Sequence, residues 1–254
     1  MEFPSFDLQG KKALVTGGNS GIGYHAALSL ARTGCEVFIT GRHRETLEKA
    51  ADELKKLGCA GYYHAADLAD TKDAIAMARR ADEVLGGVDI LVNNAGTTFV
   101  EPALAVTEEH WDNILAVNLK APFFIAQQVA PGMIRRKYGK IIMVSSLGGL
   151  RGVADHAAYC SSKGGMTLLT KVLATEWAQY NINVNAVAPT VVLTPMGEKV
   201  WGAPEKRAAK IARIPQGRLG ALADVSGAIL FLASPASDFI NGETIAVDGG
   251  SLAQ

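Results

Sequence analysis

Short apolar runs and longer stretches with helical periodicity alternate along the chain. The apolar runs predict buried strands at residues 11–17, 36–41, 60–67, 89–96, 139–146, 182–189 and 243–250. Apolar positions that recur every three to four residues predict helices at residues 21–34, 44–58, 71–87, 108–137, 159–181 and 223–234. Strands that are apolar on both faces and alternate with helices are typical of a parallel sheet. We therefore expect an α/β fold with helices on both faces of that sheet.

Capping residues and prolines set the expected limits of these helices. Gly58 predicts the end of the second helix, and Thr71 is of the type that caps the start of the third. Pro122 and Pro131 predict interruptions in the helical region 108–137. No linker, repeat or block of charge divides the sequence, so we expect residues 1–254 to form one domain. Residues 194–215, approximately, form an insertion that we expect to act as a mobile lid over the substrate.

The composition excludes several classes of function. Of the 254 residues, 48% are hydrophobic, and 25 basic side chains balance 25 acidic ones. A neutral chain without a basic block offers no electrostatic footprint for nucleic acid or an anionic membrane. No apolar run reaches the length of a transmembrane helix, and the first ten residues lack the apolar core of a signal peptide. We expect a cytoplasmic protein with three reduced cysteines, each buried by default.

The loop between the first strand and the first helix, "TGGNSGIG", is rich in glycine. Gly17, Gly21 and Gly23 permit a tight turn and a close approach of the backbone to a ligand. The free N–H groups at the start of the following helix then suit a pyrophosphate. Glycines also end strands for purely structural reasons, and the spacing departs from the usual GxGxxG, but the strand before and the helix after favour dinucleotide binding.

The end of the second strand indicates which dinucleotide is bound. An acidic residue there would bind the ribose hydroxyls of NAD, whereas this chain has Arg42. A guanidinium can pair with the 2′-phosphate of NADP, although a solvated loop arginine is also common. We therefore prefer NADP(H) and keep NAD(H) as possible. Asp67 is a candidate contact for adenine or a turn cap, and Asn94 in "NNAG" either borders the cofactor or braces its strand.

Tyr159 and Lys163 lie four residues apart on a predicted helix, and so on one face of it. A nearby ammonium favours the phenolate and is expected to lower the pKa of the tyrosine. Ser146 ends the strand that precedes this helix, at the sheet edge where α/β proteins bind ligands. Taken alone, the pair could equally be one residue at the edge of the core and one solvated lysine.

Together these motifs resemble the short-chain dehydrogenases/reductases. TGxxxGIG, NNAG, Asn118, Ser146 and Tyr159-x-x-x-Lys163 follow the order and spacing of that family from about Gly10 to Gly250. The resemblance implies a single-domain, doubly wound Rossmann-type fold and a homotetramer. It implies that Tyr159 is the general acid/base, that Ser146 orients the carbonyl, and that Lys163 binds the nicotinamide ribose. Asn118 would hold a water of a proton relay through its main chain, or mark a helix irregularity before Pro122.

Within the family, the second half of the chain is most similar to the dicarbonyl/L-xylulose reductases. They share Thr190 after Pro189, a histidine at the position of His156 and a tryptophan at that of Trp201. The similarity implies that His156 and Trp201 contact the substrate. A helix cap and a lid anchor are the structural alternatives for these two residues. Those reductases carry a basic residue where this chain has Ser20, so that the phosphate would depend on Arg42.

The resemblance and the motifs lead to the following site residues and function. The expected catalytic residues are Asn118, Ser146, Tyr159 and Lys163. The expected cofactor residues are Gly17, Asn19, Ser20, Gly21, Ile22, Gly23, Arg42, Asp67, Leu68, Asn94, Tyr159, Lys163, Val192 and Thr194. The expected substrate residues are Ser146, His156 and Trp201, and no metal is expected because neither HExxH nor a cysteine cluster is present.

The expected reaction is NADPH-dependent, reversible reduction of a carbonyl on a small sugar-like ketone or dicarbonyl. A 3-oxoacyl thioester reductase and a gluconate or polyol dehydrogenase are alternatives of the same class. A catalytically silent dinucleotide-binding scaffold is the alternative of a different class. A serine hydrolase is disfavoured because the sequence has no GxSxG elbow.

Overall fold

The seven predicted strands pair into one parallel sheet in a computed structural model, which describes residues 3–194, 197–198 and 201–254. The strands are β1 Lys12–Thr16, β2 Glu36–Gly41, β3 Tyr62–Ala65, β4 Ile90–Asn93, β5 Gly139–Val144, β6 Ile182–Pro189 and β7 Thr244–Val247. Their order is β3-β2-β1-β4-β5-β6-β7, and every pair is parallel. The order reverses beside β1, between β1 and β4, and such a switch point opens a crevice at the carboxyl ends of the strands.

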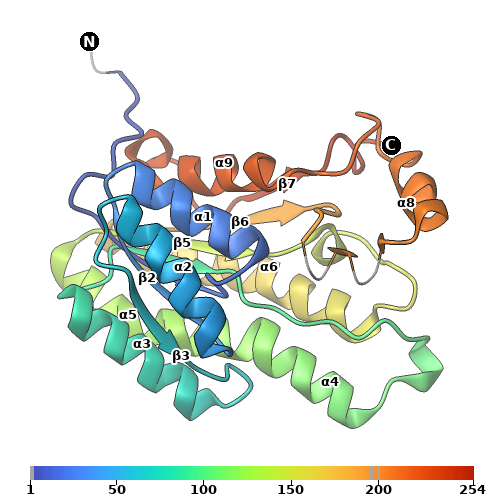
Figure 1. Cartoon of the computed structure of the whole chain (residues 1–254), viewed down its shortest axis with the longest axis horizontal. Helices are drawn as coiled ribbons and strands as arrows, with labels where there is room; N and C mark the ends of the chain where they lie inside the picture. Colours follow the sequence, from blue (N-terminus) through green and yellow to red (C-terminus); the bar gives the residue numbers. More distant parts are fainter. Residues whose placement is uncertain (1–2, 195–196, 199–200) are drawn as a thin grey trace.

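Helices cover both faces of the sheet (Figure 1). One face carries α1 Gly21–Arg32, α2 Arg44–Lys56 and α9 Leu222–Ala233. The other face carries α3 Thr71–Leu85, α5 Ala121–Arg136 and α6 Ala157–Trp177. Helices α4 Glu108–Leu115 and α8 Pro204–Ile211 lie away from the two cores. The expected α/β fold of the doubly wound, Rossmann type is confirmed.

Successive side chains of each strand belong in turn to two hydrophobic cores, one on each face of the sheet. In β5, Ile142 and Val144 pack under α1 and α9, whereas Ile141 and Met143 pack against α5 and α6. Successive side chains of a strand point to opposite faces, so a strand buried on both sides must be apolar throughout. This explains why the central strands read as continuous apolar runs rather than as alternating ones.

Two helix boundaries differ from the sequence expectation. Asp70, rather than Thr71, caps α3, because its carboxylate accepts the N–H of Lys72 at 2.8 Å. The region 108–137 is interrupted before Pro122 by a π-helical turn, η2 Ala116–Lys120, whereas Pro131 lies inside an unbroken α5. Pro122 directly follows this π-helical turn, in the first turn of α5.

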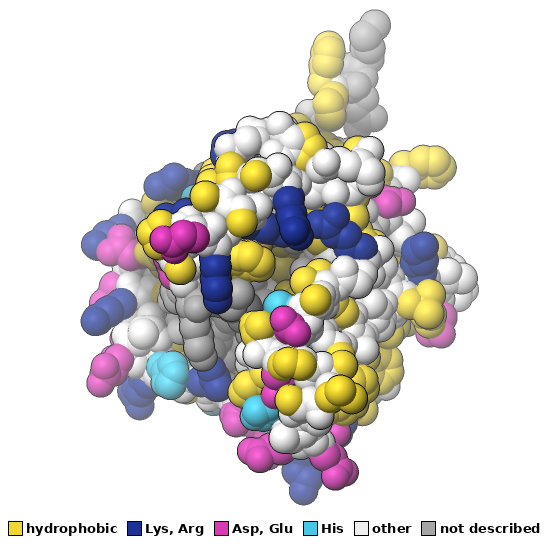
Figure 2. Space-filling model, turned by 90° about the vertical axis from the view of Figure 1, so that its right-hand side faces the viewer, with side chains coloured by type: hydrophobic (Ala, Val, Ile, Leu, Met, Phe, Trp, Pro, Cys, Tyr) yellow, Lys and Arg dark blue, Asp and Glu magenta, His cyan; other side chains and the backbone are white. Residues whose placement is uncertain are grey.

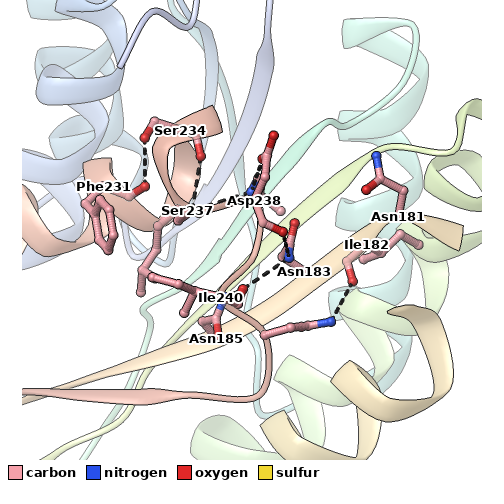
Figure 3. A network of polar contacts seen from close by, with 12 residues as sticks. Asn181, Ile182, Asn183, Asn185, Phe231, Ser234, Ser237, Asp238 and Ile240 are labelled. Carbon is pink, nitrogen blue, oxygen red and sulfur yellow. Dashed lines mark hydrogen bonds and ion pairs between the residues drawn. The ribbon is translucent and has the colours of Figure 1, made fainter. Parts of the chain in front are cut away.

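A polar network fixes the end of the sheet opposite the site (Figure 3). The side-chain amide of Asn183 donates to the carbonyls of Asp238 and Ile240 at 3.0 and 3.1 Å, and Asn185 donates to Ile240 at 2.8 Å. The buried Lys140 ammonium lies 2.7 Å from the carboxylate of Asp238. These bonds tie the chain between α9 and β7 to β5 and β6, so both strands that carry the site have a fixed base.

Candidate active site

The carboxyl ends of β1, β4, β5 and β6 surround one cavity of about 310 Å³. Its walls come from the glycine loop, the residues after β4, the loop after β5, the first turn of α6 and the segment after β6. Figure 2 shows this face hollowed, with Lys and Arg side chains gathered along one border of the hollow. The predicted residues Ser146, His156, Tyr159 and Lys163 all line the cavity.

The loop after β5 and the first turns of α6 bring the reacting groups together. Ser146 begins a short turn, and its Oγ accepts the N–H of Gly148 at 3.1 Å. Tyr159 lies one turn before Lys163 on α6, and the Nζ atom of Lys163 is 5.9 Å from the centre of the Tyr159 ring. The same ammonium donates to the carbonyl of Val144 at 2.7 Å, which fixes α6 against the end of β5.

Burial dominates the electrostatics of these groups. It raises the pKa of Tyr159, while the hydrogen bond with the Ser146 hydroxyl acts in the opposite direction. Burial also lowers the pKa of Lys163 to about 8. Burial is therefore the largest influence on the pKa of Tyr159, and the Lys163 ammonium donates to Val144; the lowering of the tyrosine pKa by Lys163 stays a prediction.

Asn118 lies in the π-helical turn η2, which confirms the helix irregularity considered for it. Its Oδ1 accepts the N–H of Thr97 at 2.8 Å, and its Nδ2 donates to the Thr97 carbonyl at 2.9 Å and to Ser162 Oγ at 3.1 Å. All these bonds hold the loop after β4 against α6, so the side chain is fully used as a brace. A direct role of Asn118 in proton transfer would therefore involve its main chain.

The start of α1 fits the pyrophosphate of a dinucleotide. Gly17 has a φ of +64°, and the N-cap Ser20 makes no side-chain hydrogen bond that would cover the first N–H groups. The first turn of α1 contains no acidic residue, and Ser20, Gly21 and Ile22 line the cavity. Uncapped N–H groups at a helix start, without a carboxylate nearby, form a site for an anion.

Arg42 and Asp67 lie at the ends of β2 and β3, outside the lining of this cavity. The carbonyl of Gly41 accepts the N–H of Ala66, which keeps the two strand ends side by side. Asp67 accepts the N–H of Ala69 at 3.0 Å and so forms the turn considered as its alternative role. Arg42 is exposed and makes no side-chain hydrogen bond or ion pair within the described ranges, which leaves its guanidinium available to a ligand.

Other predicted cofactor residues also make contacts that stabilise the fold. Asn94 Nδ2 donates to the carbonyls of Thr16 and Gly17 at 2.9 and 3.3 Å, and therefore braces β4 against β1 while lining the cavity. Asn19 Nδ2 donates to Thr46 of α2 at 2.8 Å. The side chain of Leu68 is buried in the core under α3, so that only its main chain could meet a cofactor.

The far end of the cavity carries the predicted substrate residues. His156 stands at the N-cap of α6 without a capping bond, and its Nδ1 lies 2.7 Å from the carbonyl of Ala154. A carbonyl only accepts, so Nδ1 carries the proton and a neutral His156 presents Nε2 as an acceptor. Trp201 lines the same end, as do Val192 and Thr194. The Thr190 hydroxyl there is buried and has no hydrogen-bond partner within the described residues.

Sequence reasoning missed two basic residues at this end. Arg151 lies five residues after Ser146 in the same loop, and Lys210 lies on α8 in the expected lid. The proximity of Arg151 to a predicted catalytic serine was an available signal. Lys210 carried none, because nothing in the sequence indicates which face of α8 turns towards the cavity. Part of the segment expected to form a lid, residues 195–196 and 199–200, lies outside the described residues, and its role stays a prediction.

Three further observations concern metal-binding groups, membrane-spanning helices and the cysteines. Residues 3–194, 197–198 and 201–254 contain no group of His, Cys, Asp and Glu side chains that could hold a metal ion. No helix among these same residues is both long enough and apolar enough to cross a membrane. The three cysteines are free; Cys35 and Cys59 are buried as expected, whereas Cys160 is half-buried beside Tyr159.

Comparison with known proteins agrees with this geometry. The profile described as "Enoyl-(Acyl carrier protein) reductase" matches residues 17–251. The chain is 42% identical to the L-xylulose reductase of Bos taurus over 97% of this chain and 98% of that one. It is 41% identical to the 2-dehydro-3-deoxy-D-gluconate 5-dehydrogenase of Escherichia coli over the full length of both.

A solved structure shares the fold closely. It is a Beutenbergia cavernae protein assigned as an NAD(P)-dependent gluconate 5-dehydrogenase, crystallised with NADP at low occupancy. It is 37% identical, with a TM-score of 0.94 over 98% of this chain and 99% of that one. The matched profile, the full-length relatives and the arrangement of Ser146, Tyr159 and Lys163 lead to one conclusion: the chain belongs to the short-chain dehydrogenase/reductase family of oxidoreductases.

Proposed function

We propose that the protein catalyses the reversible, NADP(H)-dependent reduction of a ketone on a small polyhydroxylated substrate. The observation that carries this proposal is the position of Ser146, Tyr159 and Lys163 on the lining of one cavity that also contains the uncapped start of α1. A proton donor, a carbonyl-orienting hydroxyl and an anion site in one cavity are what carbonyl reduction requires.

Each side chain has a defined task in this reaction. Tyr159 donates its hydroxyl proton to the carbonyl oxygen, and the Ser146 hydroxyl holds that oxygen in place. The Lys163 ammonium stabilises the phenolate that remains after proton transfer and binds the nicotinamide ribose. NADPH, when bound, supplies the hydride. Asn118 keeps the loop after β4 against α6 and, through its main chain, takes part in returning the proton to Tyr159.

The proposed cofactor is NADP(H), with NAD(H) as a weaker alternative. Support comes from Arg42, which is exposed at the end of β2 where an acidic residue would select NAD. The Beutenbergia cavernae structure with bound NADP gives independent support. The α1 start would hold the pyrophosphate through Gly17, Gly21 and Gly23, and Val192 and Thr194 would meet the nicotinamide side.

The proposed assembly is a cytoplasmic homotetramer. Leu168 and Val172 are exposed apolar residues one turn apart on α6, which supports the burial of this face against a second copy. Three free thiols suit a reducing compartment. Light scattering coupled to size-exclusion chromatography measures the oligomeric state, and a monomer at micromolar concentration would contradict the assembly.

An initial-rate screen tests the proposed function. NADPH and NADH are each paired with L-xylulose, L-sorbose, 5-dehydro-D-gluconate, diacetyl and an acetoacetyl thioester. We expect NADPH-linked turnover of the sugar ketones, with the thioester a poor substrate; preference for the thioester would instead favour the activity described by the matched profile.

Tyr159→Phe is the matched variant for this screen, because it removes only the hydroxyl. We expect a loss of about 10²–10⁴-fold in kcat, the usual contribution of a positioned proton donor. Binding of NADPH, followed by its fluorescence, should persist because the ring remains in place. A variant that retains more than about a tenth of the activity would remove Tyr159 from the reaction.

A further inference from the structure

The substrate end of the cavity has a strongly one-sided charge. Its lining includes Arg151 and Lys210 in addition to Lys163, and no Asp or Glu is present among the lining residues that the structure describes. Arg151 comes from the loop after β5, and Lys210 comes from α8, so two segments distant in sequence contribute one positive charge each. A chain with zero formal net charge therefore concentrates positive charge at this point.

Neither cation is neutralised by a neighbouring carboxylate. Arg151 donates to the main-chain carbonyl of Ser251 at 3.0 Å, and the Nζ atom of Lys210 lies 5.4 Å from the centre of the Trp201 ring. No ion pair involves either residue within the described part of the chain. Burial lowers the pKa of Lys210, and the charges of Arg151 and Arg213 lower it further. An anion between Arg151 and Lys210 would relieve this repulsion.

The position of the pair separates it from the phosphates of the cofactor. The pyrophosphate site at the start of α1 follows β1, whereas Arg151 follows β5, two strands away and therefore about 10 Å across the sheet. The hydrogen bond to Ser251 directs the Arg151 side chain towards the segment after β7, which is further from the pyrophosphate site. Strand β7 forms one edge of the sheet, and Arg42 follows β2 near the other edge. Figure 1 shows α8, which carries Lys210, on the same side as the C-terminus and away from α2 and β3.

We propose that Arg151 and Lys210 form a subsite for the carboxylate of a sugar acid, so that the substrate is a keto-aldonate rather than a neutral ketose. The proposal rests on the proposed function and names its substrate class. The guanidinium of Arg151 offers a fork that matches a carboxylate, and the ammonium of Lys210 adds a second charge-assisted bond. His156 and Ser146 then face the hydroxyl-bearing carbons and the carbonyl of the same molecule.

The relatives differ in whether the substrate in their name carries a carboxylate. L-xylulose is a neutral ketose, whereas gluconate and 2-dehydro-3-deoxy-D-gluconate carry a carboxylate. Sequence identity to the two groups is equal within a few per cent and cannot choose between them. The two unpaired cations in this chain favour the acids.

A matched pair of substrates tests the subsite. 5-Dehydro-D-gluconate and L-sorbose have the same carbon chain and configuration and differ only at the carbon remote from the ketone, which is a carboxylate in the first and CH₂OH in the second. The measurement is the ratio of their kcat/KM values with NADPH, for the wild type and for Arg151→Gln, Lys210→Gln and Lys210→Glu. Lys206→Gln, an exposed lysine of α8 outside the cavity lining, is the control.

We expect the wild type to prefer the acid by about tenfold or more, as one or two charge-assisted bonds provide. Lys210→Gln and Arg151→Gln should each lower the ratio about tenfold, chiefly through the KM of the acid, and Lys210→Glu should invert it. Lys206→Gln should keep the ratio within about twofold of the wild type. Added salt should raise the KM of the acid more than that of L-sorbose.

Several results would overturn the subsite. One is a wild-type ratio of kcat/KM for 5-dehydro-D-gluconate over L-sorbose of one or less, and another is a ratio that is unchanged in all three variants. A third is a loss of activity in the variants that comes from a higher KM for NADPH. A preference for D-fructose 6-phosphate would make the bound anion a phosphate. Reduction of L-sorbose and L-xylulose without preference for the acid would remove the subsite and leave the proposed function standing. No turnover of any sugar ketone would remove both.

Discussion

Replacement of Lys163 by methionine should make the free protein more stable at neutral pH while removing its activity. The Lys163 side chain is almost wholly buried, and its pKa is lowered from 10.5 to about 8 by burial. One pKa unit corresponds to about 1.4 kcal/mol, so the charged lysine costs about 3 kcal/mol at pH 7. Lys163→Met recovers this cost but deprives the Val144 carbonyl of its donor, a loss of about 1–2 kcal/mol. The net gain is about 1–2 kcal/mol, which raises Tm by a few degrees for a chain of this size.

The sign of this difference should change with pH. Below pH 8 the folded and unfolded wild type are both protonated at Lys163, and the full cost is present. Between about 8 and 10.5 the unfolded state holds the proton that the folded state has lost, so the stability of the wild type rises with pH. Lys163→Met lacks this rise and should become the less stable protein, by about 1–2 kcal/mol, near pH 10.

The assay is urea unfolding of the wild type and the variant without cofactor, at several values between pH 7 and pH 10. Other titrating groups are common to both proteins and cancel in the difference. Lys171→Met, an exposed position two turns further along α6, controls for the loss of a lysine and should show no such crossover. If wild type and Lys163→Met differ in the free energy of unfolding by the same amount at pH 7 and at pH 10, Lys163 does not lose its proton in this range and the reasoning is refuted.

Three further predictions follow from single contacts. Arg42→Asp should shift the ratio of kcat/KM for NADPH over NADH by about tenfold or more towards NADH, because the exposed guanidinium is replaced by a group that repels the 2′-phosphate; an unchanged ratio would assign the phosphate to another residue. His156→Ala should lower kcat/KM for polyhydroxylated ketones about tenfold more than for diacetyl, because it removes one hydrogen bond that a substrate hydroxyl donates to Nε2; equal losses would make the residue structural. Asp238→Asn should lower the free energy of unfolding by about 1–2 kcal/mol, because it removes the carboxylate that lies 2.7 Å from the buried Lys140 ammonium; the value is modest because Asp238 itself is largely exposed. In thermal unfolding, the double variant with Lys140→Met should recover this loss. Fully additive losses of the two single variants would contradict the pairing.

The sequence predicted the sheet well because each strand is buried on both faces and therefore apolar throughout. All seven strands lie where the apolar runs indicate, and their parallel orientation agrees with the helices between them. Local choices among similar capping residues were less predictable. Asp70 and Thr71 are both good caps, and only the bond to Lys72 decides between them. Pro131 was misjudged because a proline can remain inside a helix that is held by packing on the sheet, as α5 is.

The candidate site was predictable where it depends on one continuous segment. Ser146, Tyr159 and Lys163 are close in sequence, and helix spacing alone brings two of them together. The direction of the Tyr159 pKa was not predictable, because its largest cause is burial of the side chain in the folded protein. Arg151 and Lys210 were missed for a similar reason: they line one cavity only because the chain folds two distant segments around it, and no periodicity encodes that arrangement.

The reacting groups and helix α8 come from separate parts of the chain, and this separation makes the enzyme modular. Ser146, Tyr159 and Lys163 belong to the strand, loop and helix that run from β5 to α6, and the bond between Lys163 and Val144 locks that unit together. Helix α8 belongs to the excursion between β6 and α9 and follows Val192 and Thr194 in the sequence. A change confined to α8 alters which molecules enter the cavity and leaves Ser146, Tyr159 and Lys163 in place. Substrate range can therefore diverge by exchange of one short segment, while the chemistry is inherited unchanged.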